Sequence, residues 1–427
     1  MSADLKKKTF IGKLFAILLT IGPGMFCIGY TVGTGSVTSM IVAGSRFGMR
    51  LLWVLVLSCI FSWVLMEAYG RFAIVTGETA LHGLRRRYRY GNIFSILILI
   101  GVVVAQWGNF SGLIGLTSKG IYEAIRMFVP GLDPVNYWGI IGIAAFILMV
   151  LYSFLLVGKY SFFEKILVFF VTLMGLSFIV SMFIVMPPPV EIISGLVPSI
   201  PDMPGAKLMI AAFVGTTMAA PTFVVRPLLM KGKGWTAANI AEQRQDSFSA
   251  ALIMLIISGS IMVCATGALF HRGIVVTKVL DMVYTLEPVA GKFAVGVFLV
   301  GTISAGLSSA FPIMMVAPLL IGDYRAGELD TKSRMFRILA GIACLIALTV
   351  PVLGANPIAA QIATQITGVF VLPLVIASIF FLVNRRDEMG AHKAGPLLNI
   401  GITAAFVFAC IISYTAIIAI KEFFIAL

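Results

Sequence analysis

Two long apolar segments of the chain are each interrupted by small, hydroxylated and helix-breaking residues. The first interruption is Ile28-Gly-Tyr-Thr-Val-Gly-Thr-Gly-Ser36, and the second is Phe213-Val-Gly-Thr-Thr-Met-Ala-Ala-Pro-Thr222. In a bilayer every backbone N–H and C=O needs an internal partner, so a broken helix is tolerated mainly where it lines a site or cavity. Glycines that only let helices pack closely are the alternative. The matching positions of the two breaks favour a substrate site.

The residues of these two breaks are the candidate substrate-binding residues. They are Thr31, Val32, Gly33, Thr34, Gly35 and Ser36 in the first break, and Thr216, Thr217, Met218, Ala219, Ala220 and Thr222 in the second. Together they offer hydroxyls, backbone carbonyls, one thioether and the free N–H groups of half-helix N-termini. Such groups suit an anion, or a small neutral, zwitterionic or hydrated solute.

The composition identifies an integral membrane protein. The chain is 60% apolar and only 11% charged, with a mean hydropathy of +1.05, which lies outside the range of soluble proteins. We expect an all-α fold of about eleven membrane-spanning helices, because so many runs reach the length that a bilayer requires. The expected spans are 14–43, 48–76, 93–122, 137–157, 163–186, 207–230, 247–270, 290–320, 335–353, 358–383 and 397–420.

The positive charges predict the orientation. Most Lys and Arg residues fall on one set of alternate loops, including Lys6–Lys8, Arg85–Arg89 and Arg385–Arg386. Because cytoplasmic loops are enriched in Lys and Arg, the N-terminus is expected inside and the C-terminus outside. The net charge of +13 is therefore topogenic and does not indicate a nucleic-acid partner. We expect a monomer embedded in the lipid bilayer of a bacterial inner membrane.

The spans divide into two halves that each begin with a broken helix. Spans one to five (residues 1–186) and six to ten (207–384) flank a Pro-rich external loop, 187–206, and residues 385–427 add a loop and an eleventh span. An odd number of spans per half inverts the topology of the second half. This is the LeuT-type 5+5 inverted repeat plus one C-terminal helix, with helices 1 and 6 broken.

A few polar residues within or beside the spans are candidates for gating or coupling. Glu67 and Arg71, spaced i,i+4, are either a gate or a helix-surface ion pair near the cytoplasmic interface, which we favour. Arg226 either meets a departing anionic substrate or lies in the last turn of its span, which we favour. Asp246 is interpreted as a first-turn acid of the seventh span. Asn109, with Gln106, is expected to hydrogen-bond between helices.

Short motifs over most of the chain resemble the Nramp family of proton-coupled divalent-metal transporters. They are Ile21-Gly-Pro-Gly24, Gly29-Tyr30, Ala43-Gly-Ser-Arg-Phe-Gly48, Leu51-Leu-Trp53, Arg71 to Gly77, Phe163-Glu-Lys165, Ser304-Ala-Gly-Leu-Ser-Ser309, Thr364-Gln365, Leu372-Pro373 and Arg385-Arg-Asp-Glu-Met-Gly390. The resemblance implies the family's fold and its metal transport. Gln365 is similar to a substrate-proximal glutamine of the family's tenth span.

The departures from the family pattern fall on the site itself. The resemblance implies Asp and Asn metal ligands where this chain has Val32-Gly-Thr-Gly35, and a Met ligand where it has Ala219-Ala-Pro221, with Met218 one position away. Acidic residues of the family's proton path correspond to Asn109 and Gly112, and a family histidine corresponds to Arg226.

A transition metal needs carboxylate, imidazole or sulfur donors, and neither break contains a carboxylate or a histidine. We therefore predict no family-type metal site and no cofactor. A hydrated, Mg²⁺-like ion held through its waters stays open, although one carboxylate would be expected beside it.

The sequence thus favours a secondary transporter that moves a small ion or solute by alternating access, with an altered substrate and weak or no proton coupling. Two alternatives stay open: a non-transporting receptor or sensor on the same scaffold, and a conventional Mn, Fe or Mg transporter with an unusual site. An enzyme is not expected, because no Ser/His/Asp, HExxH or paired-carboxylate arrangement lies within the spans.

Overall fold

The computed structural model describes residues 29–129, 131–133, 136–157, 160–287, 294–326 and 333–425, and the elements within them are helices. Before the central loop these are α3 (Thr34–Phe47), η2 (Gly48–Leu51), α4 (Leu52–Thr76), α5 (Ala80–Arg87), α6 (Gly91–Phe128), α7 (Tyr137–Val157) and α8 (Tyr160–Ile184). The loop contains α9 (Pro189–Ser194).

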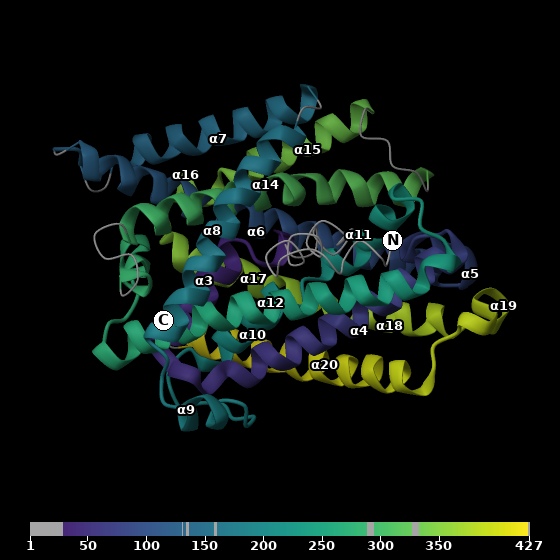
Figure 1. The fold of residues 1–427 in the computed structure, drawn as a ribbon. Coiled ribbons are helices and arrows are strands. Elements are labelled where there is room, and N and C mark those ends of the chain that lie inside the picture. Colours follow the sequence, from purple (N-terminus) through teal and green to yellow (C-terminus); the bar gives the residue numbers. More distant parts are fainter. Residues whose placement is uncertain are drawn as a thin grey trace, which may run out of the picture.

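After the loop come α10 (Ala206–Thr217), α11 (Ala220–Gly232), η3 (Ala237–Asn239), α12 (Ile240–Ala268), η4 (Phe270–Arg272), η5 (Val279–Thr285), α14 (Ala294–Ala326), α15 (Arg334–Ala347), α16 (Thr349–Leu353), α17 (Pro357–Thr367), η7 (Gly368–Val371), α18 (Leu372–Val383), α19 (Arg386–Met389), η8 (Gly390–His392) and α20 (Pro396–Ile425). Figure 1 shows most long helices running side by side in one bundle, with α7 and α15 at one edge and α20 at the opposite edge.

The helices agree with the predicted spans. Nine stretches of the described chain are long and apolar enough to cross a membrane. One of them, Gly35–Thr76, runs through the first two predicted spans, and the shorter apolar helix Thr172–Ile184 belongs to the fifth. Half of the first predicted span, residues 14–28, lies outside the described residues. The boundaries of the two halves and the central loop stay a prediction.

Both predicted breaks are present, and each has a local cause. Val32 and Gly33 separate a short helical stretch, 29–31, from α3, and Gly33 has the extended backbone of an N-cap residue, with φ −92° and ψ −172°. Met218 and Ala219 separate α10 from α11. Pro221 lies in the first turn of α11, where its missing N–H leaves no hydrogen bond unmade.

A buried ion pair joins α11 to α12. Arg226 is fully buried, and its Nη2 donates to Asp246 Oδ2 at 2.6 Å and to Ser247 Oγ at 2.9 Å. The two favoured interpretations of these residues were wrong. Arg226 lies within α11, which continues to Gly232, and Asp246 lies beyond the first turn of α12, which begins at Ile240. The two residues form an ion pair across the interface between α11 and α12. The spacing of residues along the sequence does not reveal a contact of this kind.

Removing the carboxylate of this pair should strongly destabilise the fold. Asp246→Asn leaves the Arg226 guanidinium buried without its counter-charge, which costs roughly 3–5 kcal/mol for pairs of this kind. We expect a clearly lower unfolding midpoint for the detergent-solubilised protein. Glu242→Gln, an exposed change on the same helix, is the control and should leave the midpoint unchanged; equal midpoints for both variants would contradict the role of the pair.

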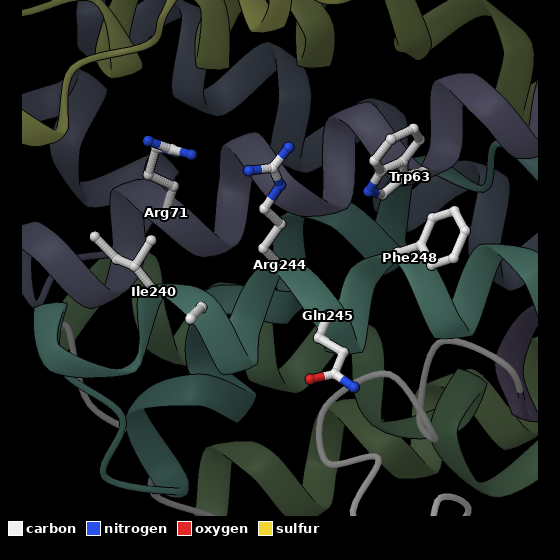
Figure 2. A pocket seen from close by; sticks show the side chains of 7 residues that line it. Trp63, Arg71, Ile240, Arg244, Gln245 and Phe248 are labelled. Atoms are coloured by element: carbon white, nitrogen blue, oxygen red, sulfur yellow. The ribbon is translucent and has the colours of Figure 1, made fainter.

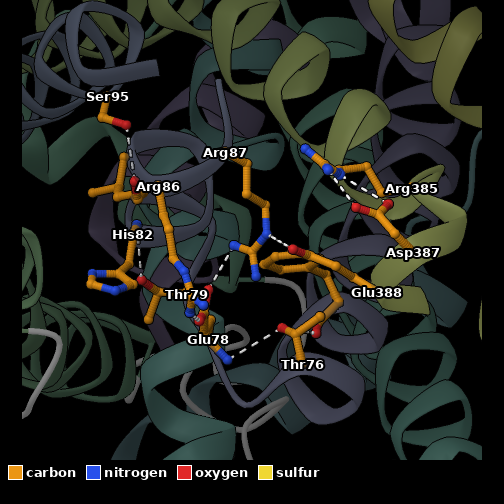
Figure 3. A network of polar contacts seen from close by, with 12 residues as sticks. Thr76, Glu78, Thr79, His82, Arg86, Arg87, Ser95, Arg385, Asp387 and Glu388 are labelled. Atoms are coloured by element: carbon orange, nitrogen blue, oxygen red, sulfur yellow. Dashed lines mark hydrogen bonds and ion pairs between the residues drawn. The ribbon is translucent and has the colours of Figure 1, made fainter. Parts of the chain in front are cut away.

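A network of charged residues ties α5 to α19 at the end of the bundle that we call the basic end (Arg71, Arg86, Arg87, Arg244 and Arg385). Figure 3 shows the Arg87 guanidinium between two carboxylates. Its Nη1 lies 2.6 Å from Glu78 Oε2, and its Nε donates to Glu388 Oε1. Arg86 Nη1 also contacts Glu78, at 2.7 Å. Partial burial opposes ionisation of Glu78, but the hydrogen bond and charge of Arg87, together with the charge of Arg86, hold its pKa below the ordinary value of 4.5.

This network should contribute stability that depends on pH. Because the folded-state pKa of Glu78 lies below its unfolded value, the contribution is present above about pH 4.5 and is lost as the pH falls through the folded pKa. Glu78→Gln should therefore unfold more easily than the parent at neutral pH, and the difference should vanish in acid. The check is unfolding in detergent from neutral to acidic pH, with Glu287→Gln as the exposed control. A difference that grows in acid would show the sign to be wrong.

Candidate functional site

A small cavity lies where the two broken helices meet α6 and α17. Its volume is about 20 Å³, enough for roughly one water molecule. Tyr30 lines it from the first break, and Gly215, Thr216, Ala219, Ala220 and Pro221 line it from the second. Ala105, Gln106 and Asn109 of α6, with Thr364, Gln365 and Gly368 of α17 and η7, complete the wall. The cavity thus lies where the sequence places the substrate site.

Hydrogen bonds between side chains hold this wall together. The Tyr30 hydroxyl donates to Gln106 Oε1, and Gln361 Nε2 donates to Asn109 Oδ1 at 2.8 Å. Ser39, on α3, donates to Gln365 Oε1 at 2.6 Å. Each bond joins a different pair of helical segments, so the carboxamides and the phenol are fixed in orientation. The predicted interhelical role of Gln106 and Asn109 is confirmed.

Two glycines allow the broken helices to approach α17 closely. A Cβ on Gly215 would lie 2.1 Å from the Gln365 backbone carbonyl oxygen, so α10 and α17 touch through their backbones. A Cβ on Gly35 would lie 2.5 Å from Gln365 Nε2 and 2.8 Å from Gln361 Nε2. A larger residue at either position would push the two glutamines away from the breaks.

Several buried polar atoms around the breaks have no hydrogen-bond partner within the part of the chain that the structure describes. They are Gln365 Nε2, Gln361 Oε1, Thr217 Oγ1 and Thr222 Oγ1. Buried polar atoms nearly always have a partner in proteins, and an atom without one is explained best by a water, an ion or a ligand. Their position beside the cavity is therefore consistent with a polar binding site.

The predicted substrate residues divide into those that line the cavity and those that support it. Four predicted substrate residues line it: Thr216, Ala219, Ala220 and Gln365. Asn109, predicted as a gating or coupling residue, lines it as well. Thr217, Met218 and Thr222 are buried beside it, and the Thr217 carbonyl accepts from Ser62 Oγ at 2.9 Å.

The other described side chains of the first break do not line the cavity. Thr31 and Val32 are buried, a Cβ on Gly33 would lie 2.3 Å from Ser309 Oγ, and Ser36 Oγ lies 3.3 Å from Ser258 Oγ. Gly35 contributes to the site by allowing Gln361 and Gln365 to lie close to α3. The side chain of Thr34 lies outside the described part of the chain.

Two of the predicted gating residues, Glu67 and Arg71, lie toward the basic end. Glu67 is 5% exposed; its Oε1 accepts from Arg71 Nη2 at 2.5 Å, and its Oε2 lies 3.7 Å from Arg244 Nε. The expected i,i+4 pair is therefore present, with a third member that the sequence did not indicate. Arg226 belongs to the separate pair with Asp246.

Sequence reasoning missed Tyr30, Ser39, Gln361 and Thr364 as parts of the site. Helical spacing offered one usable signal: Gln361 lies four residues before Gln365, on the same face of α17. Tyr30 lies within the predicted first break, but its hydrogen bond to Gln106 of α6 follows only from the fold. The contact of Ser39 with Gln365 likewise has no signal in the sequence.

The lining residues supply neutral groups that could coordinate a cation or bind a polar solute: a phenol, hydroxyls, carboxamides and backbone carbonyls. Within the residues that the structure describes, no three His, Cys, Asp or Glu side chains gather where they could hold a metal ion. Neutral oxygen donors suit hard cations that retain water, or small polar solutes. Soft transition-metal ions prefer nitrogen and sulfur.

Comparisons with known proteins agree with this architecture. The family described as "Nramp: Natural resistance-associated macrophage protein-like" matches residues 24–419. A relative from Verminephrobacter eiseniae, "Divalent metal cation transporter MntH", is 24% identical over 416 residues that cover 94% of this chain and 89% of the relative. A second protein of that name, from Ralstonia nicotianae, is 25% identical over 400 residues, which cover 90% of this chain and 87% of the relative.

Solved structures show the same fold. A manganese transporter from Eremococcus coleocola, in complex with an aromatic bis-isothiourea substituted compound, superposes with a TM-score of 0.70 at 15% identity, covering 97% of this chain and 88% of the other. MhsT in complex with L-phenylalanine superposes with a TM-score of 0.65 at 14% identity, covering 93% of this chain and 98% of the other. These likenesses confirm the all-α membrane fold of the LeuT type. Because the family match spans nearly the whole sequence, the chain belongs to the Nramp family of membrane proteins.

Proposed function

We propose that this chain is a secondary transporter that carries a hard divalent cation, of the Mg²⁺ type, with part of its hydration shell. The observation that carries the proposal is the cavity between the two breaks, lined by neutral oxygen and amide groups. Broken helices that meet at one polar cavity are the arrangement by which secondary transporters bind substrate and alternate access.

We infer the substrate class from the names of the relatives and from the oxygen and amide groups that line the cavity. Relatives across most of the chain bear the name divalent metal cation transporter, which favours a divalent cation here. Mg²⁺ accepts oxygen ligands and gives up its waters reluctantly, so it needs fewer protein ligands than a dehydrated transition-metal ion. α10 ends at Thr217, beside the cavity. The partial negative charge at a helix C-terminus favours a cation there.

The same argument disfavours Mn²⁺ and Fe²⁺ as preferred substrates. Holding a bare dication without an anionic ligand in the membrane interior is costly, whereas retained waters spread the charge over a larger shell. The cavity, with room for about one water, must widen to admit such an ion, and alternating access supplies that wider conformation. We further propose that the protein is a monomer in a bacterial plasma membrane. We place its N-terminus inside, because Lys and Arg residues are enriched in cytoplasmic loops.

Reconstituted protein should show saturable Mg²⁺ uptake that depends on Gln365. Gln365→Leu removes a carboxamide that lines the cavity, and we expect uptake at least about fivefold slower, the effect of losing one buried polar partner. Thr367→Val, an exposed change on the same helix, is the matched control and should behave like the parent. The assay compares Mg²⁺, Mn²⁺ and small zwitterionic solutes in proteoliposomes. Saturable Mn²⁺ uptake without Mg²⁺ uptake would overturn the substrate assignment.

Uptake should move few or no protons. Asn109, a neutral carboxamide already bonded to Gln361, cannot take up and release a proton as a carboxylate would. A pH-sensitive dye inside the same vesicles should report a constant lumenal pH while the cation enters. Acidification in proportion to the cation taken up would establish coupling and refute this part of the proposal.

A further inference from the structure

A groove of about 450 Å³ opens between α4 and α12, apart from the substrate cavity (Figure 2). Two arginines line it, Arg71 from α4 and Arg244 from α12, and two aromatic residues line it as well, Trp63 and Phe248. Gln245 contributes a carboxamide. Neither the family match nor the proposed transport cycle assigns a role to this groove.

The polarity of the lining changes along the groove. Figure 2 shows Arg71 at one end and Arg244 near the middle, while Trp63 and Phe248 lie together at the other end. The two rings make an edge-to-face contact with centroids 5.2 Å apart. Trp63 precedes Arg71 by two helical turns, which is about 12 Å along the helix axis. The arginines mark the basic end, so the rings lie deeper in the bilayer. A charged end followed by an apolar end matches the head group and upper acyl chain of a phospholipid.

The charges of the groove do not cancel. One carboxylate, Glu67, faces two guanidinium groups, at 2.5 Å from Arg71 and 3.7 Å from Arg244. The side chain of Arg244 is 61% exposed, so it is free to meet an anion while Glu67 remains paired with Arg71. Glu242 lies two residues before Arg244 on α12, but it is exposed and does not line the groove.

Two N–H donors of the lining residues also lack acceptors in the described part of the chain. They are Nε of Arg71 and the indole Nε1 of Trp63, and both are buried. Because these two atoms have almost no accessible surface, they do not themselves reach the groove. The exposed guanidinium of Arg244 does, and the arginine fork is well suited to phosphate.

We propose that this groove binds an anionic phospholipid, with the phosphate beside Arg244 and Arg71 and an acyl chain against Trp63 and Phe248. Basic pockets between membrane helices on the cytoplasmic side bind anionic head groups in this way. The assignment to the cytoplasmic leaflet rests on the proposed orientation. The binding itself does not depend on which substrate the chain transports.

Native mass spectrometry of the purified full-length protein tests the proposal, with phosphatidylglycerol and phosphatidylcholine as the two lipids titrated. The parent protein should retain phosphatidylglycerol in preference to phosphatidylcholine. Arg244→Gln should weaken the apparent affinity for phosphatidylglycerol about fivefold, the effect of one arginine at an anionic head group. Arg337→Gln is the matched control, because Arg337 is exposed and lies on α15 outside the groove. It should bind like the parent.

Each other outcome would overturn the proposal. Equal binding of the two lipids would remove the role of charge, and equal affinities of the two variants would place the lipid elsewhere. Competition by inorganic phosphate at the same concentration would identify a soluble anion in place of a lipid. A change of oligomeric state in Arg244→Gln, visible in the same spectra, would identify a second copy of the chain as the occupant. Because no transport is measured, failure of the substrate assignment would not affect these results.

Discussion

Backbone hydrogen bonding in a medium without water is the constraint on which the rest of this structure depends. Long apolar helices satisfy it by themselves, and most of the bundle consists of them. The two breaks depart from this rule, and protein surrounds both of them. Ser309 Oγ donates to the Gly29 carbonyl at 3.0 Å, and Ser62 Oγ donates to the Thr217 carbonyl at 2.9 Å. Side-chain hydroxyls from neighbouring helices thus replace part of the bonding that the broken helices gave up.

The site follows from the same constraint. Where the helices break, polar groups must meet other polar groups, and carboxamides are present there in addition to the serine hydroxyls. Gln365, Gln361, Gln106 and Asn109 approach the breaks from α17 and α6. Glycine at positions 35 and 215 allows the close contact. A neutral network of this kind surrounds the breaks with polar groups without placing a formal charge in the membrane, and it leaves the substrate's own charge to be met by dipoles and retained water.

The sequence predicted the fold more completely than the site. Hydropathy located the spans because a bilayer sets a minimum apolar length, and glycine, threonine and proline marked both breaks. The site was predicted only in part, because lining a cavity depends on how segments far apart in the chain face one another. Thr216 and Ala220 reach the cavity, whereas Ser36 turns toward Ser258. Arg226 and Asp246 were misplaced for the same reason, since their pairing joins two helices.

The backbone contact of Gly215 with Gln365 has a mechanical consequence. The two helices pack so closely there that the Gln365 carbonyl oxygen occupies the space that a Cβ on Gly215 would need, so we expect them to move together. The half-helix α10 and α17 should therefore travel as one rigid body. The unwound residues Met218 and Ala219 then act as the hinge about which α11, anchored to α12 by its buried ion pair, swings against that body. Opening and closing would consequently bend the sixth span at these two unwound residues.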